Sequence, residues 1–245
     1  MDGRRVVIAL IAFAAGLAVG FLFANSINRS ELSTLRAEND RMRSEKASVS
    51  TGDAKPSLTG EEIAATIARA EQNSGDLQIQ RSHGIALYRY AAIKQDAQLL
   101  QQSVEILQRA AALAPDDYDV IVTLGNANFD IGYFGKNNEA LVSAREFYAK
   151  ALAIKPSDVD VRTDVGLTYY LQTPPDLERS IGEFRKSLST NPKHEKTLRF
   201  IIEALIKQNK SAEAGEFFER LKAVNPRNES IPELTSMLAQ SQAAG

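Results

Sequence analysis

The sequence predicts an all-α protein, a solenoid of helical hairpins preceded by one N-terminal transmembrane helix and a short coiled coil. The solenoid is indicated by four prolines, which close similar segments at intervals of 41, 36 and 34 residues: Pro115, Pro156, Pro192 and Pro226. The transmembrane helix is indicated by residues 6–24, which contain no charge. A period of this length is typical of stacked supersecondary units, which form extended binding surfaces.

Residues 1–26 are predicted to form a membrane anchor. The 19 uncharged residues 6–24 would span about 28 Å as a helix, close to the roughly 30 Å of a bilayer core. The alternative is a signal peptide cleaved after Ser26. Its apolar region would usually be shorter, and Leu22-Phe23-Ala24 places a bulky residue where a small one is wanted. The sequence therefore favours an uncleaved anchor.

Residues 27–46 are predicted to form a helical stalk or short coiled coil. Gly16 and Gly20 form a GxxxG motif in the anchor, which lets membrane helices pack closely. Heptad positions a and d would be occupied in the stalk by Leu32, Leu35, Asn39 and Met42. Both features are consistent with a parallel homodimer. The alternative is a solvated helix whose spacing arises by chance, because the pattern covers fewer than three heptads.

Residues 47–58 are small and polar and predict a flexible linker, and residues 59–241 predict the solenoid with terminal capping helices. Thr59 and Glu62 have the spacing of a capping box, so the first helix should begin near residue 60 and end near residue 73. Residues 231–240 should form a helix that covers the apolar face of the last repeat.

Each repeat ends in a helix with one recurring face. In the second copy this face reads Ala144, Tyr148, Ala151 and Leu152, and Pro156 then ends the helix. The preceding helix carries a glycine in the same position of the first three copies: Gly84, Gly125 and Gly166. Because glycine weakens a helix by about 1 kcal/mol, its recurrence predicts close contact between the two helices.

These residues resemble the tetratricopeptide repeat (TPR) family, whose signature is W-x2-L-G-x2-Y…A-x3-F…P over 34 residues. The resemblance covers residues 77–226. Tryptophan is absent, and Asn128 stands where the family favours Tyr. The two longer repeats are expected to hold their extra residues in extended turns, around residues 94–100 and 132–138. The third repeat should be longer near residues 173–176.

No catalytic, metal or cofactor motif is found. The chain has no cysteine, which excludes disulfides and thiol catalysis, and its two histidines lie outside any metal-binding frame. His83 is expected to be a partly buried structural residue, and His194 to be solvated at a helix start. The 29 basic and 31 acidic residues leave no basic excess for nucleic acid. We therefore expect no enzyme activity, no cofactor and no nucleic-acid partner.

The resemblance implies a concave groove lined by the first helix of each repeat, which holds an extended peptide or a partner helix. The groove residues that we predict are Tyr88, Arg89, Asn126, Phe129, Thr163, Tyr170, Lys196, Arg199 and Glu203. Aromatic residues beside arginine are common anchors of protein interfaces. The competing interpretation is that Phe129 and Tyr170 belong to the solenoid core. The basic pattern with which some family members bind a C-terminal carboxylate is not reproduced.

The sequence thus predicts a non-catalytic, membrane-tethered TPR scaffold that binds partner proteins or peptides. Two alternatives stay open: a chaperone for an apoprotein, of the type that serves cytochrome c maturation, and an oligomeric structural spacer. Residues 161–170 look like repeats of the cytochrome c maturation group. Arg4 and Arg5 favour a single-pass protein of a bacterial inner membrane with a periplasmic solenoid. The arginines that follow the anchor favour the reverse: Arg29, Arg36, Arg41 and Arg43.

Overall fold

The computed structural model describes residues 58–243. The predicted anchor with Gly16 and Gly20, the stalk at 27–46 and the linker up to residue 57 lie outside the described residues. Within residues 58–243, no helix combines the length and the apolar character that a membrane crossing requires.

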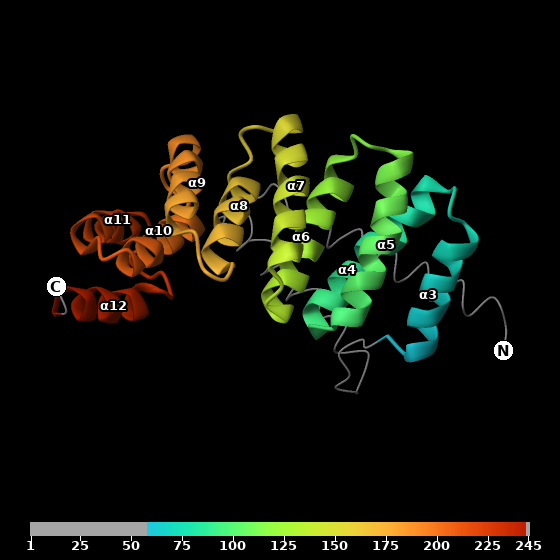
Figure 1. Cartoon of the computed structure of the whole chain (residues 1–245), viewed down its shortest axis with the longest axis horizontal. Coiled ribbons are helices and arrows are strands. Elements are labelled where there is room, and N and C mark those ends of the chain that lie inside the picture. The colour runs from blue at the N-terminus through green and yellow to red at the C-terminus, as the bar shows by residue number, and fades with distance from the viewer. Residues whose placement is uncertain (1–57, 244–245) are drawn as a thin grey trace, which may run out of the picture. The chain divides into compact units, whose positions relative to one another are not determined.

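The described residues fold into ten helices that follow one another from cyan to red in Figure 1. Their bounds are α3 Gly60–Gln72, α4 Leu77–Lys94, α5 Ala97–Leu113, α6 Tyr118–Gly135, α7 Asn138–Ile154, α8 Val159–Leu171, α9 Leu177–Thr190, α10 Glu195–Lys207, α11 Ser211–Val224 and α12 Ile231–Ala243. Helix α3 begins where the capping box predicts it, and α12 begins at the predicted Ile231.

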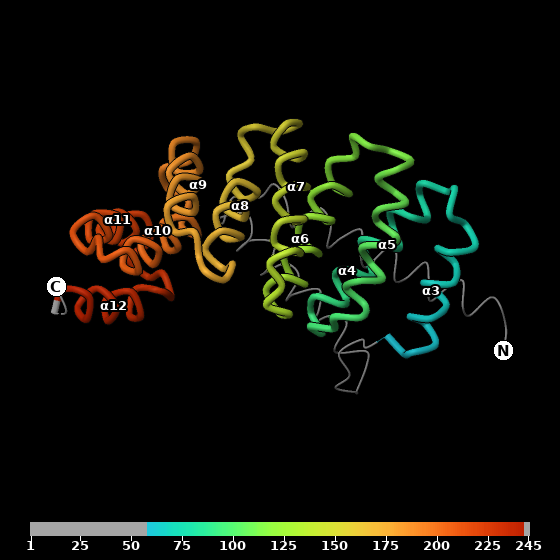
Figure 2. Tube along the Cα trace, viewed as in Figure 1, coloured from blue at the N-terminus to red at the C-terminus, as the bar shows by residue number. Residues whose placement is uncertain are grey.

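Helices pack in pairs, α4 with α5, α6 with α7, α8 with α9 and α10 with α11. Each pair also packs against the next, and the first helices of successive pairs contact one another from α4 to α10. The tube in Figure 2 shows the hairpins side by side in chain order. This arrangement confirms the predicted α-solenoid of helical hairpins.

The recurring glycines make the close helix contacts that the sequence predicts. A Cβ atom added to Gly125 would lie 2.5 Å from Cε1 of Tyr148, and one added to Gly84 would lie 2.8 Å from Cγ of Leu107. The ring of Tyr148 is only 1% exposed, so it has no room to retreat. Glycine on α4 and α6 therefore sets how closely the second helix of each hairpin can approach.

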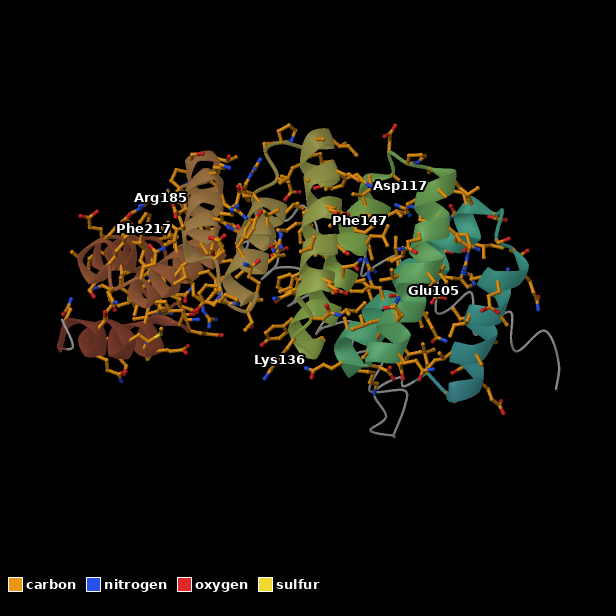
Figure 3. The ribbon with its side chains drawn as sticks, in the orientation of Figure 1. Glu105, Asp117, Lys136, Phe147, Arg185 and Phe217 are labelled. Carbon is orange, nitrogen blue, oxygen red and sulfur yellow. The ribbon has the colours of Figure 1, made fainter. Side chains whose placement is uncertain are left out.

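Aspartate or asparagine side chains cap the starts of α4 to α9, and a proline follows the second helix of each hairpin. The Asp117 side chain accepts the backbone N–H groups of Asp119 and Val120, and Asp158 accepts that of Val161. Figure 3 labels Asp117 at the start of α6 and Lys136, in the left-handed conformation, just after its end. The helices α5, α7, α9 and α11 each end two residues before their proline, as predicted.

The extra length of the first two repeats lies in their helices, which corrects the expected extended turns. Helices α4 and α6 have 18 residues and α5 and α7 have 17, whereas α8 has 13 and α9 has 14. Gly132 stays helical because it packs against Leu141, to which an added Cβ would come within 2.6 Å. In the third repeat the loop after Leu171 is longer, as predicted.

The apolar core continues through both ends of the solenoid. Leu234 and Leu238 of α12 join the cluster formed by α8 to α11 and are 0% and 6% exposed. At the other end, Ala70 of α3 is buried against Leu87 and Ile106. The terminal helices thus cover the faces that an open repeat would leave exposed.

Candidate functional site

A groove of about 550 Å³ opens along the first helices of the four hairpins. Its walls come from α4, α6, α8 and α10, with one residue from α7, and are formed by Tyr88, Asn126, Phe129, Asp130, Tyr133, Tyr148, Asp164, Leu167, Tyr170, Leu171, Lys196, Arg199 and Phe200. Pockets of this size commonly hold ligands, and their walls are usually apolar with a few polar groups.

Aromatic rings make up much of the wall. The Phe129 and Tyr133 rings stack on α6 with centroids 6.5 Å apart, and the Tyr170 ring meets the edge of Phe200 at 6.2 Å. Tyr133 is 53% exposed, so its ring is available to a partner. The wall therefore offers flat apolar surface from both α6 and α10.

Two ion pairs occupy the α10 side of the groove. The Lys196 ammonium lies 2.6 Å from Asp164 Oδ1, and Arg199 Nε lies 2.8 Å from Glu203 Oε1. The Tyr170 hydroxyl donates to Glu203 Oε2 at 3.0 Å. The two cations that line the groove are thus both engaged by carboxylates of the chain.

Asp130 stands on the α4–α6 side and has a different environment. Its Oδ2 accepts a hydrogen bond from the Tyr88 hydroxyl at 3.1 Å. Burial raises the pKa of the Asp130 carboxyl to about 6, the Tyr88 hydrogen bond opposes this shift, and the charge of Asp164 adds to it. Burial and the neighbouring Asp130 raise the pKa of Tyr88 far above its usual value, so Tyr88 remains a donor at neutral pH.

Six of the nine predicted groove residues line this groove together: Tyr88, Asn126, Phe129, Tyr170, Lys196 and Arg199. The prediction for Thr163 is wrong. Its side chain is 0% exposed, and its hydroxyl lies 3.0 Å from Ser187 Oγ and 2.6 Å from Thr197 Oγ1. Residue 163 lies near the start of α8 and faces the last turn of α9, at Ser187, and the first turn of α10, at Thr197.

Glu203 and Arg89 also lie outside the groove walls. Glu203 is 9% exposed and lies behind the wall, where its carboxylate accepts hydrogen bonds from Tyr170 and Arg199. Arg89 follows Tyr88 by one residue, which is 100° around the helix, and it is not among the residues that line the groove. Its guanidinium is half-buried, and burial lowers its pKa.

Tyr170 and Phe129 are partly core residues, as the competing interpretation holds. Tyr170 is 8% exposed and belongs to the same apolar cluster as Phe184 and Leu205. Phe129 packs against this cluster and also against the one around Tyr148. Both side chains thus pack in the core and also line the groove.

Sequence reasoning missed several residues of the wall. Tyr133 and Phe200 lie four positions after the predicted Phe129 and Lys196, so helical spacing could have found them. Leu171 lies four positions after Leu167, which also lines the groove. Tyr148 comes from the second helix of its hairpin, where its hydroxyl donates to Asn126 Oδ1 at 2.9 Å. No sequence signal marks this contact.

A chain of polar groups around His194 looks like a catalytic triad but is closed to substrate. His194 Nδ1 lies 2.6 Å from Thr197 Oγ1, and its Nε2 lies 3.2 Å from Asp160 Oδ1. Thr197 is 0% exposed, so its hydroxyl cannot reach a substrate carbonyl. His194 is only 16% exposed, which corrects the expectation of a solvated residue. Among residues 58–243 no cluster of metal-ligating side chains occurs.

Comparison with known proteins gives structural matches only. No protein-family profile matches the sequence, and no curated protein does. The crystal structure of MamA, a TPR-like protein, matches with a TM-score of 0.53 and 18% identity, over 68% of this chain and 88% of MamA. The fold is TPR-like.

Two further MamA structures agree with this result. AMB-1 MamA matches with a TM-score of 0.52 and 19% identity, over 68% of this chain and 91% of the other. A double mutant of RS-1 MamA matches with a TM-score of 0.55 and 18% identity, over 69% and 86%. The TM-scores show that these proteins share the TPR-like fold. At identities of 18–19% the comparison shows the fold alone.

Proposed function

We propose that this protein is a non-catalytic, membrane-tethered TPR scaffold, which binds a partner protein or peptide in the groove of its first helices. Its role would be the assembly or biogenesis of a membrane or envelope complex. The MamA-like fold supports a role in protein interaction, because TPR-like solenoids present extended surfaces to their partners.

The groove is the observation that carries this proposal. Residues of four hairpins line its volume of about 550 Å³, so a ligand that fills the groove contacts several repeats. Side chains such as Tyr133 and Phe200 offer apolar contact, and Lys196 and Arg199 are held in fixed positions by their carboxylate partners. Aromatic and arginine anchors of this kind dominate the energetics of protein interfaces.

The membrane tether rests on the sequence of residues 6–24, which are uncharged over 19 positions. A scaffold fixed at a membrane would hold its partner close to the bilayer. This location is what favours a membrane or envelope complex over a freely diffusing assembly.

Photo-crosslinking tests the groove. A photoreactive phenylalanine analogue at position 133, which is 53% exposed in the groove, should crosslink to a discrete partner in intact cells. The matched control is position 142 on α7, which is 44% exposed and does not line the groove. Tyr133→Ala should also reduce co-purification of this partner from detergent-solubilised membranes, whereas Val142→Ala should not. Equal crosslinking and capture from both positions would contradict the proposal.

A further inference from the structure

The charges of the groove are balanced everywhere except at Asp130. Asp164 is paired with Lys196 at 2.6 Å, and Arg199 is paired with Glu203 at 2.8 Å. Asp130 has a hydrogen bond from Tyr88, and among residues 58–243 no lysine or arginine forms an ion pair with it. The other charged group that acts on it is Asp164, which is also negative.

A half-buried carboxylate without a cation is costly, and proteins usually pair such a group. Tyr88 supplies one donor to Oδ2, so the second carboxylate oxygen is available to another donor. Asp130 lines the groove, and a ligand in the groove can therefore reach it. The missing charge at this point is positive.

The surroundings of Asp130 suit the same kind of ligand. Its neighbour Phe129 stacks with Tyr133, and Tyr88 and Tyr148 complete this side of the wall. The faces of aromatic rings attract cations, most often the planar guanidinium of arginine. An apolar side chain next to the cation would find Leu167, Leu171 and Phe200 a short distance along the wall.

From this complementarity we propose that the α4–α6 end of the groove binds an arginine or lysine side chain of the partner, with Asp130 as its counter-ion and with an adjacent apolar side chain against α8 and α10. The inference rests on the proposed function, since it specifies the chemistry of the segment that the groove holds. An acidic segment fits less well, because its carboxylates would meet Asp130 while Lys196 and Arg199 already have partners.

Two capped peptides test this inference on the full-length chain in detergent. One is acetyl-Ala-Leu-Arg-Leu-Ala-amide, and the other has citrulline, a neutral isostere, in place of arginine. Binding is followed by NMR of ¹³C-labelled tyrosine rings, because Tyr88 and Tyr133 line this end of the groove. The arginine peptide should shift both signals and bind about tenfold more tightly than the citrulline peptide, as expected for a hydrogen bond between charged groups.

The variant Asp130→Asn keeps the shape of the side chain and an acceptor for Tyr88, and it should abolish the preference for arginine. Equal affinity of the two peptides, or a preference that survives Asp130→Asn, would overturn the inference and leave binding in the groove intact. Failure of both peptides to bind, in a protein that still crosslinks to its partner through position 133, would also overturn it.

A second sample, labelled with ¹³C at the aspartate carboxyl carbons, shows whether a cation of the chain itself pairs with Asp130. The Asp130 carboxyl carbon should titrate above the ordinary range of aspartate in the unliganded protein, and its pKa should fall when the arginine peptide is added. If it titrates below that range before any peptide is added, a basic residue of the chain itself fills the position. The assignment to an external partner would then be wrong.

Discussion

Gly166 on α8 lies directly against the ring of Phe184 on α9. A Cβ atom on Gly166 would come within 2.5 Å of Cε1 of Phe184, and that ring is 0% exposed. The same relationship joins Gly125 to Tyr148 one repeat earlier. In each of these two hairpins, the contact between a glycine and an aromatic ring thus sets the distance between the two helices.

Gly166→Ala should destabilise the protein. Alanine improves helix propensity by about 1 kcal/mol, but the added methyl group must displace a ring that has no free space. We expect a net loss of about 1–3 kcal/mol in the free energy of unfolding, measured by denaturant titration. Gly182→Ala on α9 is the control. No atom lies within 4 Å of its added Cβ, so this variant should gain up to about 1 kcal/mol. Stabilisation by both substitutions would contradict the packing argument.

Truncating the rings that face the glycines should cost far more stability than truncating a ring in the groove. Tyr148→Ala and Phe184→Ala should each lose about 3–5 kcal/mol of unfolding free energy, because both residues are buried. Tyr133→Ala, at a residue 53% exposed, should change it by no more than about 0.5 kcal/mol. Thermal unfolding of the three variants checks the order, and a large loss for Tyr133→Ala would show that its ring belongs to the core.

Asp130→Asn should stabilise the protein in a pH-dependent manner. Burial raises the pKa of Asp130 to about 6 in the folded state, and Tyr88 on α4 and Asp164 on α8 are the titratable groups that act on it. The folded protein therefore binds this proton more tightly than the unfolded chain. The proton's contribution to wild-type stability is complete below about pH 4 and is lost as pH rises through about 6.

The Asp130→Asn variant does not lose stability in this way, because its side chain does not ionise. Its advantage over the wild type, measured by urea denaturation, should grow by about 1–3 kcal/mol between pH 4 and pH 7. An advantage that is constant over this range would mean that Asp130 titrates alike in the folded and unfolded states.

Thr163→Val should destabilise the junction between α8, α9 and α10. The Thr163 hydroxyl donates to the Val159 carbonyl at 2.6 Å and lies within hydrogen-bond distance of Ser187 and Thr197. Its removal breaks these contacts and places a methyl group against the Ser187 and Thr197 hydroxyls, which remain 3.0 Å from each other, so we expect a loss of about 1–3 kcal/mol. Thr163→Ser keeps the hydroxyl and should lose only about 1 kcal/mol for the methyl group. Equal losses in the two variants, measured by calorimetry, would assign the effect to packing alone.

The predicted anchor leads to an extraction experiment. Because residues 6–24 are long enough to span a bilayer, the full-length protein should stay in the membrane fraction after alkaline carbonate treatment. Deletion of residues 6–24 should release it. An alkaline phosphatase fusion after Gly245 should be active if the solenoid is periplasmic. Recovery of the wild-type chain in the soluble fraction, beginning near Ile27, would instead indicate a cleaved signal peptide.

The sequence by itself determined the repeat architecture. The spacing of the prolines, the recurring glycines and the terminal helix each reflect local physics, because proline ends a helix and helical spacing assigns residues to one face. The resemblance to TPR repeats placed Tyr88, Asn126 and Phe129 on the groove side of their helices. The sequence could not show where the extra residues of the first two repeats lie. Residues typical of turns, such as Gly132 and Lys136, can equally lie within or just after a longer helix.

Only the tertiary structure decided which of the groove residues are engaged and which are available. Thr163 and Glu203 share the polar character of Lys196, but contacts with residues about 30 positions away bury the first two. The role of Asp130 also depends on the tertiary structure. Its charge is unbalanced because Lys196 and Arg199 pair with other carboxylates. Long-range pairing of this kind depends on how the hairpins stack, and no local pattern of residues encodes it.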